Sequence, residues 1–219
     1  MTAQPDGIAT EAIRFWDERY TSRRTEHGRM WSGRVNATVA QQVSGLAPGR
    51  VLELGSGEGA DALWLAERGW RVTAVDISTV ALEVGASEAA KAGLSDRIDW
   101  VQSDLASWSP SDEYDLVTSA FLHSPVEFPR DAILRRAVSA VAPGGRLLIV
   151  GHGGFPPTSE HVHDTEIPPF PTSDEVLASL DLANDWTIET NTAVERTAKW
   201  RGDEDVVLLD TVLRVRRFG

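Results

Sequence analysis

The sequence predicts one α/β domain in which helices cover both faces of a doubly wound, mostly parallel sheet. Apolar runs of strand length alternate with helix-period segments through most of the 219 residues, as in a parallel sheet covered on both faces. The length suits a single domain, and 42% hydrophobic with 25% charged residues is an ordinary globular composition. We therefore expect one domain over residues 1–219, with its sheet core starting at residue 46.

Seven segments are expected to form the sheet. Five short apolar runs predict parallel strands at residues 50–54, 71–77, 98–102, 114–120 and 146–151. Two later segments, 186–198 and 206–215, flank a polar turn at 201–205 and predict a hairpin. Because a hairpin reverses the chain, the sheet should end on an antiparallel strand.

Capping residues, glycines and a proline mark the helices. Ser78 and Gly93, for example, suit the start and the end of a helix over residues 79–92. Pro143 cannot continue a helical ladder, so the helix before it should end near residue 141. The expected core helices are residues 61–68, 79–92, 130–141 and a short one, opened by a capping box, over 172–180.

Two segments are expected to act as covers. Residues 1–45 hold helix candidates at 11–20 and 35–43 around a polar linker at 21–33, and they predict a helical cap or lid. Residues 152–171 are rich in Gly, Pro and His, and a loop of this length is often a lid. We expect this loop to lie over a substrate site.

Composition limits the partners and the location of the protein. With 33 acidic and 21 basic side chains, the net charge of −12 repels phosphate backbones and anionic lipid, so we expect neither nucleic acid nor membrane as a partner. The chain starts without a signal-peptide pattern and has no apolar run of membrane-spanning length. The absence of cysteine fits a reducing cytoplasm. We expect a cytoplasmic monomer or homodimer.

The segment Glu53 to Asp61 carries the clearest ligand signal. Its glycines follow the first predicted strand and let the backbone turn sharply and pass close to a ligand. Asp76 ends the second strand about 20 residues after Gly55, where a carboxylate can accept both hydroxyls of a ribose. The two features predict a nucleoside cofactor. The alternative is a tight strand-helix turn in which Asp76 only caps the segment after it.

Which nucleoside binds there is a separate question. Residues 55–60 also fit the loose dinucleotide pattern, so an NAD(P)-dependent oxidoreductase and a non-catalytic cofactor-binding module are alternatives. An oxidoreductase needs a hydride-acceptor site, and neither Tyr20 nor Tyr114 belongs to a Tyr-x-x-x-Lys pair. Glu53, Asp104 and the terminal hairpin instead favour S-adenosylmethionine.

Together these motifs resemble the class I S-adenosylmethionine-dependent methyltransferases over residues 51–218. Residues 51–59 are similar to that family's first motif, and residues 141–145 are similar to its usual entrance to the fifth strand. The resemblance implies a Rossmann-like sheet that binds S-adenosylmethionine and releases S-adenosylhomocysteine. It also implies a cofactor-binding set in the core, namely Glu53, Gly55, Ser56, Gly57, Asp76, Ile77, Asp104, Leu105, Ala120 and Phe121.

The amino-terminal segments extend this resemblance. Residues 15–20 and 30–33 are similar to segments of small-molecule members related to tellurite-resistance and thiopurine methyltransferases. The resemblance implies that Trp16, Tyr20 and Trp31 fold over the cofactor, whose sulfonium cation aromatic faces attract. The alternative is that Trp16 and Trp31 are packing residues of the cap.

Two histidines are candidate catalytic residues. His123 follows the fourth strand and could take a proton from a neutral acceptor, and His152, after the fifth strand, could face the same acceptor. The alternative for both is packing or orientation, because positioning alone can supply much of the rate of methyl transfer. His161, His163 and Asp164 have metal-ligand spacing but no further apparent ligand, so we expect no metal. The aromatic cap and the loop indicate a small, partly apolar acceptor and leave the methylated atom open.

Overall fold

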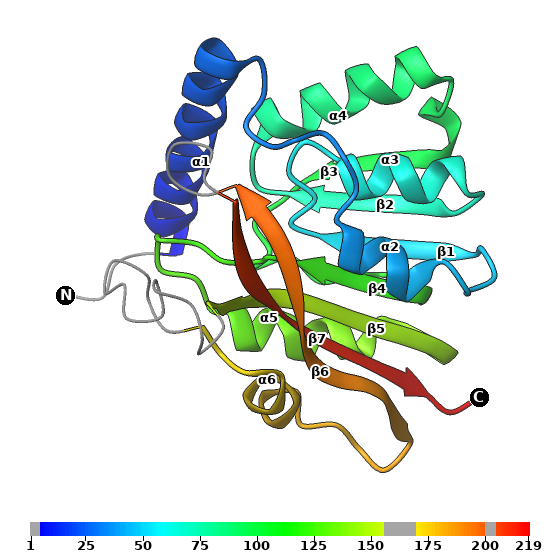
Figure 1. Cartoon of the computed structure of the whole chain (residues 1–219). Helices are drawn as coiled ribbons and strands as arrows, with labels where there is room; N and C mark the ends of the chain where they lie inside the picture. The colour runs from blue at the N-terminus through cyan, green and yellow to red at the C-terminus, as the bar shows by residue number, and fades with distance from the viewer. Residues whose placement is uncertain (1–4, 156–169, 200–204) are drawn as a thin grey trace.

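The protein is described here by a computed structural model that covers residues 5–155, 170–199 and 205–219 (Figure 1). Most of the expected loop at 152–171 and of the expected turn at 201–205 lies outside these described residues. The same is true of the three candidate metal ligands, His161, His163 and Asp164.

The seven predicted strands form one sheet in the order β3-β2-β1-β4-β5-β7-β6. Strands β1 to β5 are parallel, and β7 lies antiparallel between β5 and β6. The doubly wound fold with an antiparallel carboxyl-terminal hairpin is therefore confirmed. The strands are β1 (Arg50–Leu54), β2 (Arg71–Asp76), β3 (Ile98–Gln102), β4 (Tyr114–Ala120), β5 (Val141–Gly154), β6 (Trp186–Lys199) and β7 (Asp205–Arg217).

Strand β5 starts five residues earlier than predicted, at Val141 instead of Arg146. Val141 pairs with Tyr114, and the register then shifts so that Arg146 pairs with Leu116. The intervening Ala-Pro-Gly-Gly forms an irregular stretch, since proline has no N–H for the ladder. The preceding helix ends at Ser139, two residues before the predicted residue 141, so Val141 can pair although Pro143 follows it.

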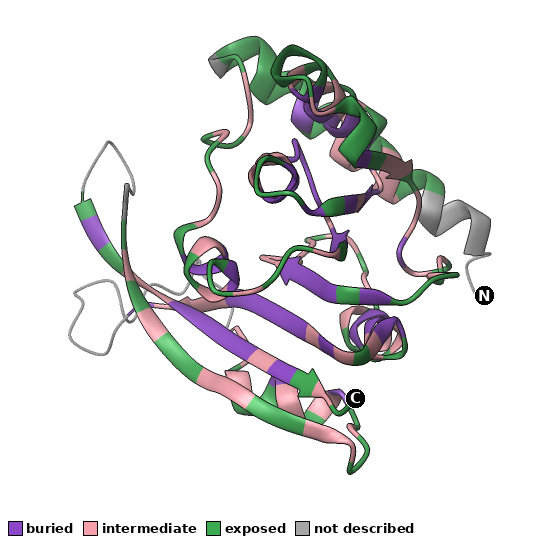
Figure 2. Cartoon of the chain, turned by 90° about the vertical axis from the view of Figure 1, so that its right-hand side faces the viewer, coloured by how far each residue is buried: buried purple, intermediate pink, exposed green. Residues whose placement is uncertain are grey.

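Helices pack on both faces of the sheet (Figure 1). On one face α2 (Ala37–Val43), α3 (Ala60–Glu67) and α4 (Thr79–Ala92) cover a core that includes Val51 and Val72. On the other face α5 (Arg130–Ser139) and α6 (Ser173–Ser179) cover Leu52 and Leu147. The central strands are buried on both faces, as expected for parallel strands, whereas β6 at the edge is largely exposed or intermediate (Figure 2).

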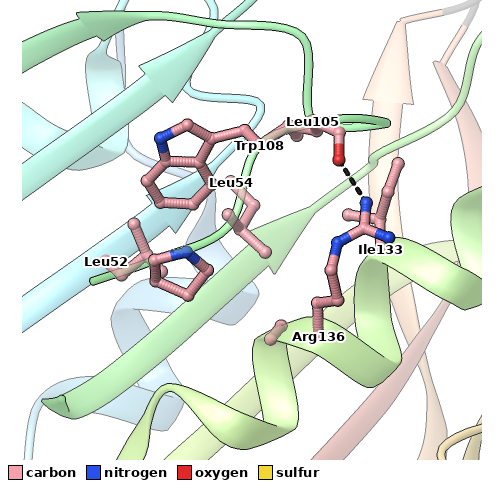
Figure 3. Close-up of a pocket in the computed structure, with 8 residues that line it drawn as sticks. Leu52, Leu54, Leu105, Trp108, Ile133 and Arg136 are labelled. Carbon is pink, nitrogen blue, oxygen red and sulfur yellow. Dashed lines mark hydrogen bonds between the residues drawn. The ribbon is translucent and has the colours of Figure 1, made fainter. Parts of the chain in front are cut away.

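A loop takes the place of a helix between β3 and β4. Trp108 and Pro110 from this loop cover Leu52 and Leu54, together with Arg136 of α5 (Figure 3). The Arg136 guanidinium donates hydrogen bonds to two carbonyls of the loop. The cavity left between these side chains is about 10 Å³, roughly the volume that one water needs, so it is a packing gap and no ligand site.

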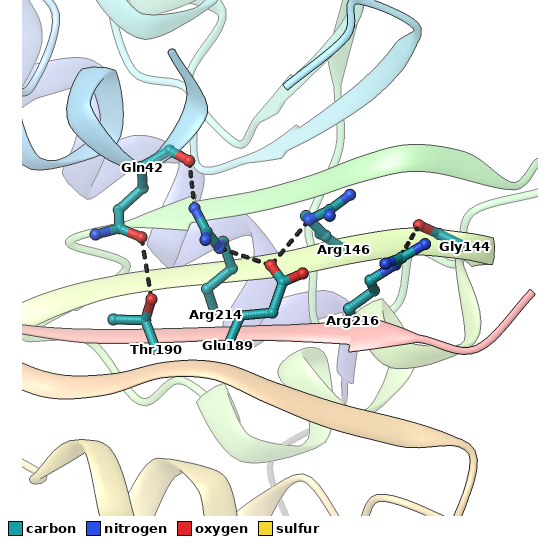
Figure 4. Close-up of polar contacts among 7 residues, drawn as sticks. All are labelled: Gln42, Gly144, Arg146, Glu189, Thr190, Arg214 and Arg216. Atoms are coloured by element: carbon teal, nitrogen blue, oxygen red, sulfur yellow. Dashed lines mark hydrogen bonds and ion pairs between the residues drawn. The ribbon is translucent and has the colours of Figure 1, made fainter. Parts of the chain in front are cut away.

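Polar contacts hold the outer hairpin to the rest of the sheet (Figure 4). One Glu189 oxygen lies 2.9 Å from the Nε atoms of both Arg146 and Arg214. Arg214 also donates to the carbonyl of Gln42 in α2. These contacts join β5, β6, β7 and α2, and Glu189 offsets part of the charge of Arg146 and Arg214.

Helix α1 (Pro5–His27) is much longer than the predicted helix at residues 11–20. Residues 21–27 were expected to be linker, but their two arginines and one glutamate are good helix formers, and the helix continues to Gly28, whose φ is +80°. Helix α1 stands across the edge of the sheet where the parallel strands end (Figure 1). Among the described helices, none is both long and apolar enough to cross a membrane.

Candidate functional site

Most of the predicted site residues gather where the parallel strands end. Strands β1 and β2 end at the glycine-rich turn and at Asp76, and we call this region the β1–β2 end. Strand β4 ends at Ala120, shortly before His123, whereas β5 runs to Gly154, so His152 lies inside the strand and does not follow it as predicted. We call this region the β4–β5 end. The two regions adjoin, because a Cβ added to Gly55 would lie 2.6 Å from Leu122 Cδ1.

The glycines of the glycine-rich turn let neighbouring side chains pack close to its backbone. Gly55, Gly57 and Gly59 all have left-handed φ values, between +54° and +76°. A Cβ on Gly57 would lie 3.0 Å from the Tyr20 hydroxyl oxygen, so this glycine lets the cap come close. A Cβ on Gly59 would lie 2.2 Å from the Trp100 ring, so this glycine serves packing against β3.

Asp76 is buried and fixed by the backbone around it. Its Oδ2 accepts a hydrogen bond from Gly57 N at 2.7 Å, and its Oδ1 accepts one from Ser78 N at 2.9 Å. Burial raises the pKa of the Asp76 carboxyl, and the backbone donors partly offset this. A carboxylate offers about four lone-pair sites, so Asp76 keeps acceptor capacity for a hydroxyl donor beside these backbone bonds.

Asp76 belongs to an acidic cluster with Glu53 and Asp61. Burial raises the pKa of Glu53 well above its usual value, and the charges of the other two carboxyls raise it further. Burial also raises the pKa of Asp61 to about 6, although the Asn36 N–H bonded to it acts in the opposite direction. Glu53 Oε2 is buried without a hydrogen-bond partner among the described residues, so the cluster suits a cationic or hydrogen-bond-donating ligand.

The cap is fastened to this region by acidic side chains. The Glu58 carboxylate accepts hydrogen bonds from Met30 N at 3.1 Å and from Trp31 N at 3.0 Å. Asp17 Oδ1 accepts a hydrogen bond of 2.6 Å from Ser78 Oγ. The sequence pattern did not single out Glu58 or Asp17, because a carboxylate on a helix or in a turn ordinarily faces solvent.

The three predicted aromatic residues of the cap take different positions. Tyr20 is buried against Gly57 and receives a hydrogen bond of 3.3 Å from the Trp31 indole N–H. Trp16 is partly buried, with its ring centroid 6.0 Å from that of Tyr20. Trp31 is 53% exposed, so it supports Tyr20 from the solvent side.

The remaining predicted contacts lie on either side of Asp76 and Glu53. Asp104, after β3, is partly buried, and its Oδ1 accepts a hydrogen bond from Ala106 N, while Leu105 is buried in the core. Ile77 and Ala120 are partly buried at the ends of β2 and β4. The hydroxyls of Ser56, which was predicted, and of Ser119, which was not, are buried without described hydrogen-bond partners.

The two candidate catalytic histidines lie together at the β4–β5 end. Their rings are stacked with centroids 5.4 Å apart, and the Phe170 ring is 5.1 Å from His123 and 5.0 Å from His152. Phe121 lies 4.4 Å from His152 and has a left-handed φ of +52°, a strained conformation for a bulky residue. We call Phe121, His123, His152 and Phe170 the ring cluster.

Both histidines are neutral at pH 7. Burial, the Arg130 charge and His152 lower the pKa of His123 to about 4. Burial also lowers the pKa of His152, although Asp210 raises it in part. A general base acts best when its pKa is near the working pH, so His123 is a weak base in this environment.

Two arginines complete the β4–β5 end, and the sequence pattern singled out neither. Arg196 forms a two-point ion pair with fully buried Asp210, at 2.7 and 3.1 Å. Arg130 donates from Nε to the Leu122 carbonyl at 3.2 Å and has no ion pair with another described residue. Among the described residues, no group of three or more His, Asp or Glu is placed to hold a metal ion.

Comparisons with known proteins give the chain its relatives. Residues 51–145 match the family described as "Methyltransferase domain". A 2-heptyl-1-hydroxyquinolin-4(1H)-one methyltransferase from Mycobacteroides abscessus is 31% identical over 169 residues, which cover 74% of this chain and 69% of that protein. Thiocyanate methyltransferase 1 from Brassica oleracea is 27% identical over 177 residues, which cover 77% of either chain. The chain spans about half the length of several other curated relatives.

A solved structure, that of the DhpI–SAH complex, shares the fold. It aligns with a TM-score of 0.61 at 22% identity, over 98% of this chain and 99% of that one. A likeness at this level of identity concerns the fold alone, and it agrees with the single sheet described above.

Proposed function

Because the chain belongs to the class I S-adenosylmethionine-dependent methyltransferases, we propose that it methylates a small molecule held at the β4–β5 end. The observation that carries this proposal is the ring cluster, a partly apolar aromatic surface adjoining the β1–β2 end through Gly55 and Leu122. Two relatives are named for small acceptors, a hydroxyquinolone and thiocyanate. Family membership disfavours the oxidoreductase and the non-catalytic alternatives.

In this proposal S-adenosylmethionine lies at the β1–β2 end. Asp76 receives the ribose hydroxyls, and Asp104 and Leu105 border the adenine. Support comes from the acidic cluster and from the unpartnered oxygens of Glu53, Ser56 and Ser119, which suit a ligand with an ammonium group and a sulfonium cation. When bound, the cofactor supplies a methyl group that its sulfonium already activates.

The protein's own contribution is positioning. The cap residues Trp16 and Tyr20 close over the β1–β2 end and exclude water, and the ring cluster orients the acceptor in line with the methyl group. Neutral His123 and His152 contribute shape and hydrogen bonding more than proton removal. Effective molarity from such orientation is worth about 7–11 kcal/mol in favourable cases.

The wider arrangement is part of the same proposal. The described part of residues 1–45 acts as a lid on a single domain, and Phe170, at the described end of the predicted loop 152–171, borders the acceptor. The net charge of −12 supports a small-molecule acceptor over nucleic acid, and the absence of cysteine supports a cytoplasmic location. We expect a monomer or a homodimer.

The test is a coupled assay for S-adenosylhomocysteine release across phenols, N-hydroxy heterocycles, thiols, amines and small anions. We expect turnover with at least one class and a catalytic defect in Phe170→Ala. The exposed Phe218→Ala is the control, because Phe218 lies outside the ring cluster. Turnover of RNA or protein substrates alone would contradict the proposal.

A further inference from the structure

The β4–β5 end contains a cationic group that has no counter-ion among the described residues. Arg130 opens α5, and its guanidinium is partly buried. Its described partner is a neutral one, the Leu122 carbonyl. Burial lowers the pKa of the Arg130 guanidinium, and only the adjacent Asp131 in the sequence opposes this. A partly desolvated guanidinium without a carboxylate is costly, and a bound anion would relieve that cost.

Arg196, in the same region, differs from Arg130 because it has a carboxylate partner. Its guanidinium reaches buried Asp210 through two hydrogen bonds, so its charge is already neutralised. Thr38 also donates to Asp210, which completes that site. The lack of a described carboxylate partner is therefore specific to Arg130 and is not a general property of arginines at the β4–β5 end.

The donor groups around Arg130 converge on one point. A Cβ on Gly151 would lie 2.8 Å from Thr211 Oγ1, 3.8 Å from His123 Nε2 and 3.9 Å from Arg130 Nη2. His123 Nε2 is itself buried without a hydrogen-bond partner among the described residues. Gly151 thus has no room for a side chain, and it lets two polar atoms and one cation lie close together beside it, a set of groups that suits the oxygen or sulfur of a small anion.

We propose that the methyl acceptor binds as an anion, with its charged oxygen or sulfur atom held by Arg130 and His123 beside the ring cluster. This inference rests on the proposed function and deepens it by giving the acceptor a charge. The acceptor class is a small aromatic or planar acid that is ionised at neutral pH, such as a carboxylate, an acidic phenol, an N-hydroxy heterocycle or a thiol.

The charges balance without a base. A lone pair of the anionic acceptor forms the new bond to the methyl carbon, and the bond between that carbon and the sulfonium sulfur breaks. The electron pair of the broken bond stays on sulfur. The cationic methyl donor and the anionic acceptor thus become neutral S-adenosylhomocysteine and a neutral methylated product. No proton is transferred, which agrees with the weak basicity of His123.

The test compares benzoate with benzamide, two probes of one shape that differ in charge, by calorimetry on the full chain with bound S-adenosylhomocysteine. We expect benzoate to bind about 10-fold or more tightly than benzamide, the scale of one charged hydrogen bond. Arg130→Met should abolish this preference, and Arg130→Lys should keep part of it. The matched control is Arg135→Met, because Arg135 lies on the same helix and donates to Ser179 O instead.

Equal binding of the two probes, binding of neither, or an unchanged preference in Arg130→Met would overturn the inference. Circular dichroism and S-adenosylhomocysteine affinity check that Arg130→Met is folded. If Arg130→Met does not fold, Arg130→Lys still tests the inference, because it should keep only part of the benzoate preference. The acceptor assay separates the two proposals. Turnover of neutral amines without a benzoate preference defeats only this inference. A benzoate preference without small-molecule turnover would support an anion site at Arg130 but defeat the proposed function, and with it the assignment of that anion as the methyl acceptor.

Discussion

The β1–β2 end and the β4–β5 end lie on one edge of one sheet, yet they bury groups of opposite charge. The first holds three carboxyls whose pKa values burial raises, Glu53, Asp61 and Asp76. The second holds two histidines and Arg130, whose pKa values burial lowers. The first region thus carries the desolvation cost of carboxylates. Because the histidines are neutral at pH 7, the second carries the desolvation cost of the Arg130 guanidinium, and in either region a ligand of the opposite sign would offset it.

This difference accounts for the chemistry that we propose. A cationic methyl donor fits the acidic region, and an anionic acceptor fits the region around Arg130. The two regions touch at Gly55 and Leu122, so the groups that react would meet where the opposite fields adjoin. The protein then needs no strong base, because charge neutralisation accompanies transfer.

The largest expected effect comes from breaking the acidic region at Asp76. Asp76→Asn replaces one acceptor oxygen by a donor, so one of the N–H groups of Gly57 and Ser78 loses its partner and the ribose loses a charged acceptor. We expect S-adenosylmethionine affinity measured by calorimetry to fall about 100-fold. Asp99→Asn, on the exposed part of β3, is the control. Unchanged affinity in Asp76→Asn would place the ribose elsewhere.

A smaller effect is expected from loosening the cap while the acidic cluster stays intact. In Glu58→Gln one of the two backbone donors, Met30 N or Trp31 N, loses its carboxylate acceptor. Hydrogen exchange across residues 28–33 should speed up, and S-adenosylmethionine affinity should fall about 10-fold. Glu67→Gln at the exposed end of α3 serves as the control. Identical exchange in both variants would mean that Glu58 does not hold the cap.

The smallest expected effect is a pair of opposite pH slopes in stability. The folded pKa of Asp61, about 6, exceeds its ordinary value of 3.8, so this group makes stability fall as pH rises from about 4 to 6. The folded pKa of His123, about 4, is below its ordinary value of 6.5. This group therefore makes stability fall as pH drops from 6.5 to about 4.

Urea unfolding of the ligand-free protein between pH 4 and 7 measures these slopes. Relative to the wild type, Asp61→Asn should gain stability as pH rises, and His123→Gln should gain stability as pH falls. Slopes of the same sign in the two variants would remove the contrast between the two regions.

The sequence predicted the sheet well because apolar runs report burial directly. All seven strands occur, and the glycine-rich turn and Asp76 lie together as expected. Helix α1 was underestimated because its last turns are polar, and polarity resembles a linker when no packing partner is visible. The early start of β5 depends on pairing with Tyr114, a contact that is not local in sequence.

The missing parts of the candidate site share one physical reason. Asp17 contacts Ser78, and Glu58 contacts Met30 and Trp31, across separations of 61, 28 and 27 residues. Arg130 is distinctive only because its surroundings hold no carboxylate partner among the described residues, and a sequence shows the arginine but not the missing partner. Charged residues on helices and in turns ordinarily face solvent, so their pattern gave no signal.

Proton release on binding S-adenosylmethionine tests the opposition of charges most directly. A cation beside the acidic cluster should lower the raised pKa values of Glu53, Asp61 and Asp76, so protons should leave near pH 6, the pKa of Asp61. Calorimetry at that pH in two buffers of different ionisation enthalpy measures the number released. We expect net proton release when the wild type binds S-adenosylmethionine. Fewer protons should be released when it binds S-adenosylhomocysteine, which lacks the sulfonium charge. The Glu53→Gln variant should also release fewer protons than the wild type on binding S-adenosylmethionine. Equal proton exchange for the two ligands, or proton uptake, would contradict the opposition of charges.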